Sequence, residues 1–249
     1  MSGPSRFFEI DLFRGIAILM MVLFHSLFDL YWFGIYPVTV TSGFWRYFAF
    51  STATLFLLIV GVSFTISYAR AAPKLPPRSL YLKFLKRGAG IFALGLLVTL
   101  ATWLYLGEGY IVFGILHLIG VSIILAPIFY RFGKWNVVLG AIVILTGFAL
   151  TNIPGPIWLL PLGLHPAAWW SVDYEPLFPW FGVVLAGIGI GSVFYPGGVR
   201  RFRMPEIPEI PARWWEVLAF PGKHSLLIYL VHQPVIILVL HFTTGAVPL

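Results

Sequence analysis

The sequence lacks cysteine altogether and contains few charged residues. With no cysteine in 249 residues, a disulfide, a thiolate nucleophile and a thiolate metal site are all excluded, and no metal site of another kind is predicted. Charged residues make up 10% of the chain, whereas soluble domains carry roughly 25%. Because hydrophobic residues reach 59% and the mean hydropathy is +0.92, the composition indicates an integral membrane protein.

Acidic residues are scarcer than basic ones, at 9 Asp and Glu against 16 Lys and Arg. In a soluble chain this excess would suggest a nucleic-acid partner. In a membrane protein, positive charge concentrates in cytoplasmic loops, so we expect no nucleic acid as a partner. The first residues also lack a signal-peptide layout, because no small-residue cleavage site follows a short apolar core.

Seven stretches are long and apolar enough to cross the roughly 30 Å hydrocarbon core of a bilayer. They lie near residues 12–33, 46–69, 85–106, 110–130, 135–152, 178–195 and 224–244. The loop between the fifth and sixth is rich in Pro, Trp and Gly and is typical of an interfacial or re-entrant segment. Prolines across 196–222 predict an extended connection with a short helix near 213–220. We therefore expect an all-α, polytopic helical bundle that forms a single transmembrane domain over residues 1–249.

The basic residues alternate across the predicted spans. They fall before the first span and in the loops after the second, fourth and sixth, whereas the opposite loops hold Glu108, Asp173 and Glu175 with Arg46 as their cation. Cytoplasmic loops carry the excess of Lys and Arg. This pattern predicts a cytoplasmic N-terminus, an outer C-terminus and a multi-pass protein of the cell (plasma) membrane, surrounded by lipid.

The first predicted span carries the densest set of polar residues. His25 and Asp29 are four residues apart, so they share one face of a helix. Arg14 lies eleven residues before His25, on nearly the same stripe and roughly 16 Å away along the axis. An imidazole with a nearby carboxylate is the arrangement that a general base needs.

The predicted topology sorts the other ionisable residues by depth. His25, Asp29, His117, Asp173 and His241 fall in the outer half and could share an outward-facing acid–base cavity. Arg14, Lys86, Arg87, Lys223 and His224 could surround a cytoplasmic mouth that attracts anions. Each has a structural alternative: the histidines as packing residues, Arg14 as a snorkelling residue paired with Asp11, and Lys86 and Arg87 as topology determinants. Glycines in 182–191 favour close helix packing over nucleotide binding, because no strand precedes them.

Three stretches show a family resemblance. EIDLFRGIAILMMVLFH (9–25) resembles the first helix of the transmembrane acyltransferases, a superfamily that includes the heparan-alpha-glucosaminide N-acetyltransferases, their prokaryotic relatives and the acyltransferase-3 proteins. DYEPLFPWFGVVLAGIGIG (173–191) and GKHSLLIYLVHQPVI (222–236) are similar to later helices of the same superfamily. The first of the three motifs is the most specific.

The resemblance implies a membrane enzyme that uses acyl-CoA, here acetyl-CoA, to acylate an amine or hydroxyl of a sugar or glycan beyond the membrane. The histidine that acyltransferase-3 proteins require at the end of this helix corresponds to His25. The heparan-type group has its histidine in the following loop, and this chain has none between Leu27 and Thr54, so a role for His117 stays open. Asp173 would hold sugar hydroxyls and Trp180, with other outer-loop tryptophans, would stack on the ring.

Two other functions stay open on the residues alone. Intramembrane histidines and carboxylates also build proton-coupled transporters, which would move a solute without consuming a CoA thioester. The second open function is that of a haem protein, with His25 and either His117 or His241 as the axial ligands. Glycine-rich helix faces could pack within one chain or between copies, so a homo-oligomer is compatible with the sequence.

Overall fold

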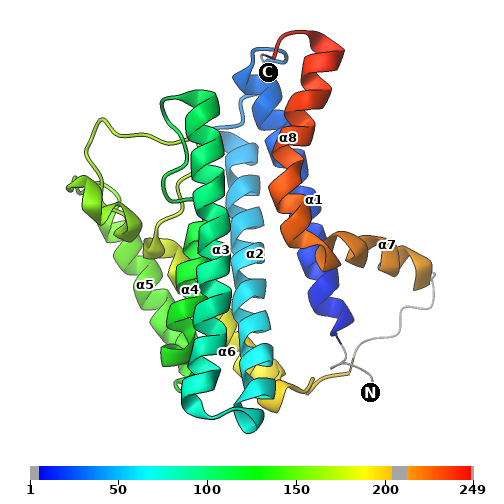
Figure 1. Cartoon of the computed structure of the whole chain (residues 1–249), viewed down its shortest axis with the longest axis vertical. Helices are drawn as coiled ribbons and strands as arrows, with labels where there is room; N and C mark the ends of the chain where they lie inside the picture. Colours follow the sequence, from blue (N-terminus) through cyan, green and yellow to red (C-terminus); the bar gives the residue numbers. More distant parts are fainter. Residues whose placement is uncertain (1–5, 204–211, 248–249) are drawn as a thin grey trace. The chain divides into compact units, whose positions relative to one another are not determined.

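The computed structural model describes residues 6–203 and 212–247, with side chains of the second range described from residue 215 onward. Within these ranges the chain forms helices and loops and has no strand (Figure 1). The α-helices are α1 (Phe8–Trp32), α2 (Gly43–Ala71), α3 (Pro77–Leu106), α4 (Ile115–Tyr130), α5 (Asn136–Leu150), α6 (Leu177–Phe194), α7 (Ala212–Lys223) and α8 (Ser225–Thr244). The predicted all-α class is therefore confirmed.

Six stretches of the described chain are long and apolar enough to cross a membrane, and they contain α1, α2, α3, α5, α6 and α8. The predicted span at 110–130 is shorter than expected, because α4 begins at Ile115 and has 16 residues. A helix of that length rises about 24 Å, less than the roughly 30 Å core. The chain is thus a multi-pass helical membrane protein, with six candidate spans and one shorter apolar helix among its described residues.

The two long loops have the irregular conformation that their proline and glycine content predicts. The stretch between α5 and α6 contains the 3-10 helix η3 (Ile157–Leu162) and no α-helix, as its prolines and glycines predict. The predicted extended connection over 196–222 begins with the 3-10 turn η4 (Pro196–Gly198), and its part at 204–211 lies outside the described residues. The short helix expected near 213–220 is confirmed as α7.

The chain divides into two compact units, with the boundary inside α2. Unit 1 comprises Met1–Phe56 and Pro205–Leu249, and unit 2 comprises Leu57–Met204. In unit 1, α1 packs against α7 and α8 (Figure 1). The single domain predicted over residues 1–249 stays a prediction.

Glycines set the close helix packing inside unit 2. A Cβ at Gly88 of α3 would lie 2.6 Å from the carbonyl oxygen of Gly120 on α4. A Cβ at Gly182 of α6 would lie 2.5 Å from the carbonyl oxygen of Gly140 on α5. Small residues let membrane helices approach at the backbone, so the packing role predicted for the 182–191 glycines is confirmed.

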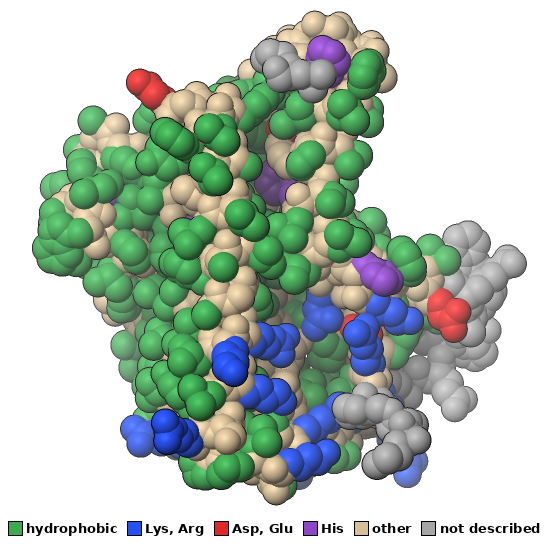
Figure 2. All heavy atoms as spheres, in the orientation of Figure 1, with side chains coloured by type: hydrophobic (Ala, Val, Ile, Leu, Met, Phe, Trp, Pro, Cys, Tyr) green, Lys and Arg blue, Asp and Glu red, His purple; other side chains and the backbone are tan. Residues whose placement is uncertain are grey.

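The surface of unit 2 is apolar over its helices and basic at one end. Large side chains of α3 point outward, with Leu97 59% and Leu104 72% exposed, which suits contact with lipid. Lys and Arg side chains gather toward the end where α2 and α3 are joined (Figure 2). The basic residues of this connection and of the adjacent turns of α3 are Arg70, Lys74, Arg78, Lys83, Lys86 and Arg87. The cytoplasmic side predicted for this connection stays a prediction.

Candidate active site

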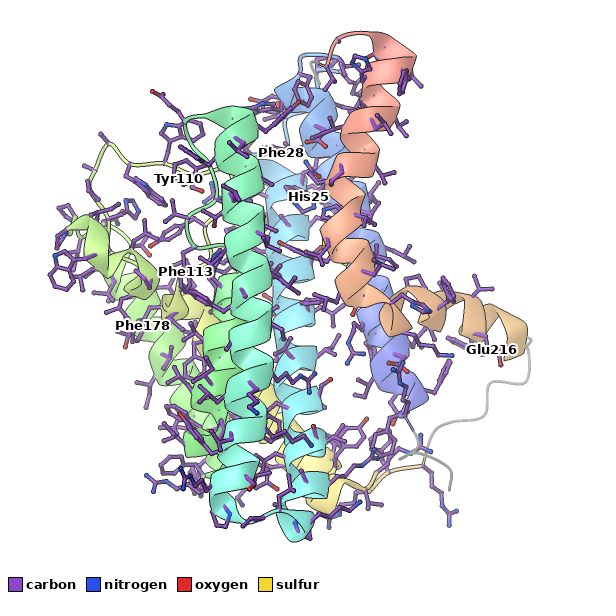
Figure 3. The ribbon with its side chains drawn as sticks, in the orientation of Figure 1. His25, Phe28, Tyr110, Phe113, Phe178 and Glu216 are labelled. Carbon is purple, nitrogen blue, oxygen red and sulfur yellow. The ribbon has the colours of Figure 1, made fainter. Side chains whose placement is uncertain are left out.

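His25 lies on α1 beside α8, and both helices belong to unit 1 (Figure 3). Its Nδ1 lies 3.0 Å from the carbonyl oxygen of Met21 and 3.3 Å from Nε2 of His232 on α8. A carbonyl only accepts, so Nδ1 of His25 carries the proton and Nε2 carries a lone pair. No described residue hydrogen-bonds to this Nε2. A partly exposed imidazole held by one nitrogen, with the other available, can act as a base or nucleophile.

Asp29 has a different partner from the one that its spacing predicts. Nε2 of Gln233 on α8 donates to both carboxylate oxygens, at 2.8 and 3.0 Å, and the carboxylate is buried. The expectation that Asp29 orients His25 is therefore corrected: the ring is held by Met21 and His232 instead. A helical spacing of four brings two residues to one face, but a neighbouring helix can offer each a better-placed partner.

The other end of α1 brings together three of the residues predicted for the cytoplasmic mouth. Nη1 of Arg14 donates to Oδ1 of Asp11 at 3.0 Å and approaches the carbonyl oxygen of Gly222 at 3.5 Å. Lys223 and His224 follow Gly222 directly, and both are exposed. Unit 1 therefore places an arginine, a lysine and a histidine at the junction of α7 and α8.

Two glycines explain why this junction lies so close to α1. A Cβ at Gly15 would meet backbone atoms of Leu218 and lie 3.3 Å from the backbone nitrogen of Gly222. A Cβ at Gly222 would lie 2.8 Å from the backbone nitrogen of Gly15. Such contact permits only glycine at both positions. From this crossing, His25 and His232 are each ten residues further along their segments, about 15 Å on α1.

His117, in unit 2, is fully enclosed and has both ring nitrogens engaged. The N–H of Gly114 donates to Nδ1 at 3.3 Å, and Nε2 lies 3.4 Å from Oγ1 of Thr99. Its ring lies between Phe92 and Phe113, with centroids at 5.0 and 5.6 Å, and 1% of its surface is exposed. These contacts suit a residue that fixes the start of α4 and leave no ring nitrogen available for chemistry.

Asp173 also fixes the start of α4. Its carboxylate accepts a hydrogen bond from the backbone N–H of Ile115, and a Cβ at Gly114 would lie 2.5 Å from its Oδ2. The N–H of Val172 donates to the carbonyl of Gly109, which joins the two loops. Helix α4 therefore starts five residues later than predicted, because backbone groups in the residues before Ile115 hydrogen-bond to the loop between α5 and α6.

The carboxyl groups of this loop are perturbed by burial. Burial raises the pKa of Asp173 to about 6, against the opposing hydrogen bond from Ile115. Burial, and then the nearby charge of Asp173, raises the pKa of Glu175 well above its ordinary value. Oε2 of Glu175 is buried without a hydrogen-bond partner. Burial also raises the pKa of Tyr174 to about 12, and its hydroxyl donates to the carbonyl of Leu160 at 2.6 Å.

The remaining predicted residues lie on the helices of unit 2. Lys86 and Arg87 are exposed on α3. Trp180 is 8% exposed near the start of α6, which counts against a role as a stacking surface for a sugar. Trp158 and Trp170, in the loop between α5 and α6, are 72% and 50% exposed and suit that role better. The convergence predicted for His25, His117 and Asp173 stays a prediction, because His25 belongs to unit 1 and the other two to unit 2.

Sequence reasoning missed His232 and Gln233 as site residues. They hold His25 and Asp29 respectively, and both lie in the closing motif at 222–236. No sequence signal marked them, because the equal spacing of the two histidines from Gly15 and Gly222 has meaning only once the structure shows that the segments cross at these glycines.

The fold and the site define a multi-pass helical membrane protein with a histidine pair in contact between two of its helices. The matching family model is heparan-alpha-glucosaminide N-acetyltransferase, catalytic, over residues 6–234. The chain belongs to this family, and the resemblance seen in its three motifs is confirmed. Membership assigns it to the membrane acyltransferases. The chain matches no curated protein and no solved structure.

Proposed function

We propose that the protein transfers an acetyl group from cytoplasmic acetyl-CoA to an amine or hydroxyl of a sugar or glycan on the outer side of the plasma membrane. The observation that carries the proposal is the state of His25. Its Nδ1 is committed to Met21 and His232, while its Nε2 has a lone pair and no described partner. The charge pattern of the loops supports a cytoplasmic N-terminus for this proposal.

The Nε2 lone pair supplies the base for direct transfer. Nε2 removes the proton from the acceptor as the acceptor nitrogen or oxygen attacks the thioester carbonyl. The carbon–sulfur bond then breaks, and the leaving CoA thiolate takes the proton from His25. If Nε2 instead attacks the thioester carbonyl first, the carbon–sulfur bond breaks, CoA leaves as the thiolate and Nε2 carries the acetyl group. The acceptor then attacks this acetyl carbonyl, the bond between Nε2 and the carbonyl carbon breaks with its electron pair returning to Nε2, and the proton of the acceptor passes to the CoA thiolate.

The basic end of α1 suits the phosphates of CoA. Arginine and lysine bind phosphate through charge-assisted hydrogen bonds, and Arg14, Lys223 and His224 lie together at this end. Roughly 16 Å of helix separates Arg14 from His25, comparable to the reach of a pantetheine arm. Lys86 and Arg87 are proposed as further phosphate ligands from the exposed surface of α3.

The acceptor would meet polar groups near the other end of α1. Oε1 of Gln233 is buried without a hydrogen-bond partner, while the amide nitrogen of the same side chain is held by Asp29. A buried acceptor without a partner is costly, so a hydroxyl or N–H of the substrate would gain by donating to it. Asp173 is proposed at the entry for the acceptor. The exposed Trp158 and Trp170, rather than the buried Trp180, are proposed as the surface on which a sugar ring stacks.

The first test is calorimetry of acetyl-CoA binding to the detergent-purified protein. We expect Arg14→Ala to weaken binding about ten-fold, the worth of a charged hydrogen bond to phosphate. Arg46→Ala is the matched control, because Arg46 is exposed at the start of α2 and predicted on the outer side. Binding should then be followed by release of free CoA when amino sugars are added. Absence of binding to folded protein, or solute flux without CoA release, would overturn the proposal in favour of a transporter.

A further inference from the structure

His232 makes two contacts that together define its protonation. Its Nδ1 lies 2.6 Å from the carbonyl oxygen of Tyr229 on its own helix, and its Nε2 lies 3.3 Å from Nδ1 of His25. Because a carbonyl cannot donate, Nδ1 of His232 must carry the proton. Nε2 of a neutral His232 is then an acceptor, which is what the protonated Nδ1 of His25 requires.

The hydrogen bonds therefore run in one direction through both rings. His232 donates to Tyr229 and accepts from His25, whose single Nδ1–H is shared between Nε2 of His232 and the nearer carbonyl of Met21. His25 keeps its lone pair on the far nitrogen, Nε2. The ring centroids are 4.9 Å apart, and His232 is 8% exposed, so the acceptor is held in place by packing.

We propose that His232 is a positioning residue for His25: it fixes the ring with Nε2 free and stabilises the imidazolium that forms when Nε2 takes a proton. A neutral imidazole thus has the role that a carboxylate has in a Ser-His-Asp triad. When His25 gains a proton at Nε2, its Nδ1–H becomes a charged donor to His232, and such hydrogen bonds are stronger than neutral ones. This inference rests on the proposed function.

Three substitutions at position 232 separate positioning from packing. His232→Gln can present a carbonyl oxygen near the position of Nε2, His232→Asn can present one only near Nδ1, and His232→Phe keeps the volume without an acceptor. We expect Phe and Asn to lower kcat about 10²-fold, the usual scale for acid–base assistance, with KM for acetyl-CoA within about two-fold. His232→Gln should recover at least about ten-fold of that loss. Loss of packing alone would not distinguish Gln from Asn, and Asn replaces Phe in the comparison if the Phe variant does not fold.

A second measurement tests the inference without acetyl transfer. Diethyl pyrocarbonate modifies the lone pair of a neutral imidazole, and mass spectrometry of peptides reports the rate at His25. We expect slower labelling of His25 in the Phe and Asn variants and near wild-type labelling in the Gln variant. The exposed His224 should label equally in all variants and is the internal control.

The two readouts separate the possible failures. Labelling that follows the expected order in a protein without acetyl transfer would leave the inference standing and remove the proposed function. Acetyl transfer and labelling that are alike in the wild type and all three variants would overturn the inference and leave the function standing. Equal loss in Gln, Asn and Phe would also overturn it, because the acceptor at Nε2 would then have no role.

Discussion

His25 and His117 look alike in the sequence and differ in the structure. Both interrupt long apolar stretches, and both were expected in the outer half of the membrane. In unit 1, His25 is partly exposed and one of its nitrogens is without a described partner. In unit 2, His117 is 1% exposed and its two nitrogens contact Gly114 and Thr99.

The difference bears on which of the two histidines has a ring nitrogen that a substrate could meet. A buried polar side chain must be hydrogen-bonded, and each partner that satisfies it also removes an atom from chemistry. His117 is satisfied at both ends, so it contributes to stability. His25 is satisfied at one end through Met21 and His232, which leaves the other end for a substrate.

The largest expected effect follows from removing His25. Replacing it with Ala removes the base, and we expect acetyl transfer to fall by about 10³-fold or more, on the scale of general-base catalysis. Binding of acetyl-CoA should be retained, because Arg14 lies at the other end of α1. The measurement is CoA release with calorimetry on the same preparation. Wild-type turnover in the Ala variant would remove His25 from the mechanism.

Replacement of His117 is expected to lower the stability of the protein and to leave its activity nearly unchanged. His117→Ala leaves a cavity and an unpaired N–H at Gly114, so we expect the melting temperature to fall by about 5–10 °C. Below that temperature, kcat should stay within about two-fold of the wild type, since the ring has no free nitrogen.

His117→Asn is the matched variant, because its carbonyl oxygen can still accept from Gly114 and should restore part of the stability. A loss of kcat as large as that of His25→Ala, in a protein with unchanged melting temperature, would show that the two histidines share the chemistry.

Much of the fold followed from the sequence because bilayer physics is strongly constraining. Length and apolarity identified the helices, and the prolines around 205–221 located α7. The start of α4 was missed because residues 109–114 are apolar enough for a span, yet they pair with the loop at 171–175. Pairing between loops about 60 residues apart leaves no periodicity in either segment.

Only part of the candidate site could be predicted from the sequence. Arg14 and His25 lie on one continuous helix, as their spacing predicts, and the α7–α8 junction lies beside Arg14 as expected. The partners of His25 and Asp29 were wrong, because they come from α8, about 200 residues further along the chain. Helical periodicity shows which residues share a face, but it does not show which side chains of another helix meet that face.

The smallest expected effect is a pH dependence of the melting temperature that arises from Asp173, in the loop between α5 and α6. Burial raises the pKa of Asp173 from its ordinary 3.8 to about 6. The folded protein thus holds this proton more tightly than the unfolded chain does, and the resulting stability is present at low pH and lost as pH rises through about 6. We expect the melting temperature in detergent to be a few degrees higher at pH 5 than at pH 7.

Asp173→Asn tests this assignment, because Asn has the shape of the protonated acid and can still accept from Ile115. The variant should show a smaller difference in melting temperature between pH 5 and pH 7 than the wild type, and not a flat profile, because burial also raises the pKa of Glu175. Glu108→Gln, at an exposed carboxyl in the α3–α4 loop, should keep the wild-type difference. If Asp173→Asn keeps the full wild-type difference, the titrating group lies elsewhere. A reduced difference in Asp173→Asn, with the wild-type difference kept in His117→Asn, would assign the start of α4 a pH-sensitive carboxyl cap and a pH-insensitive histidine.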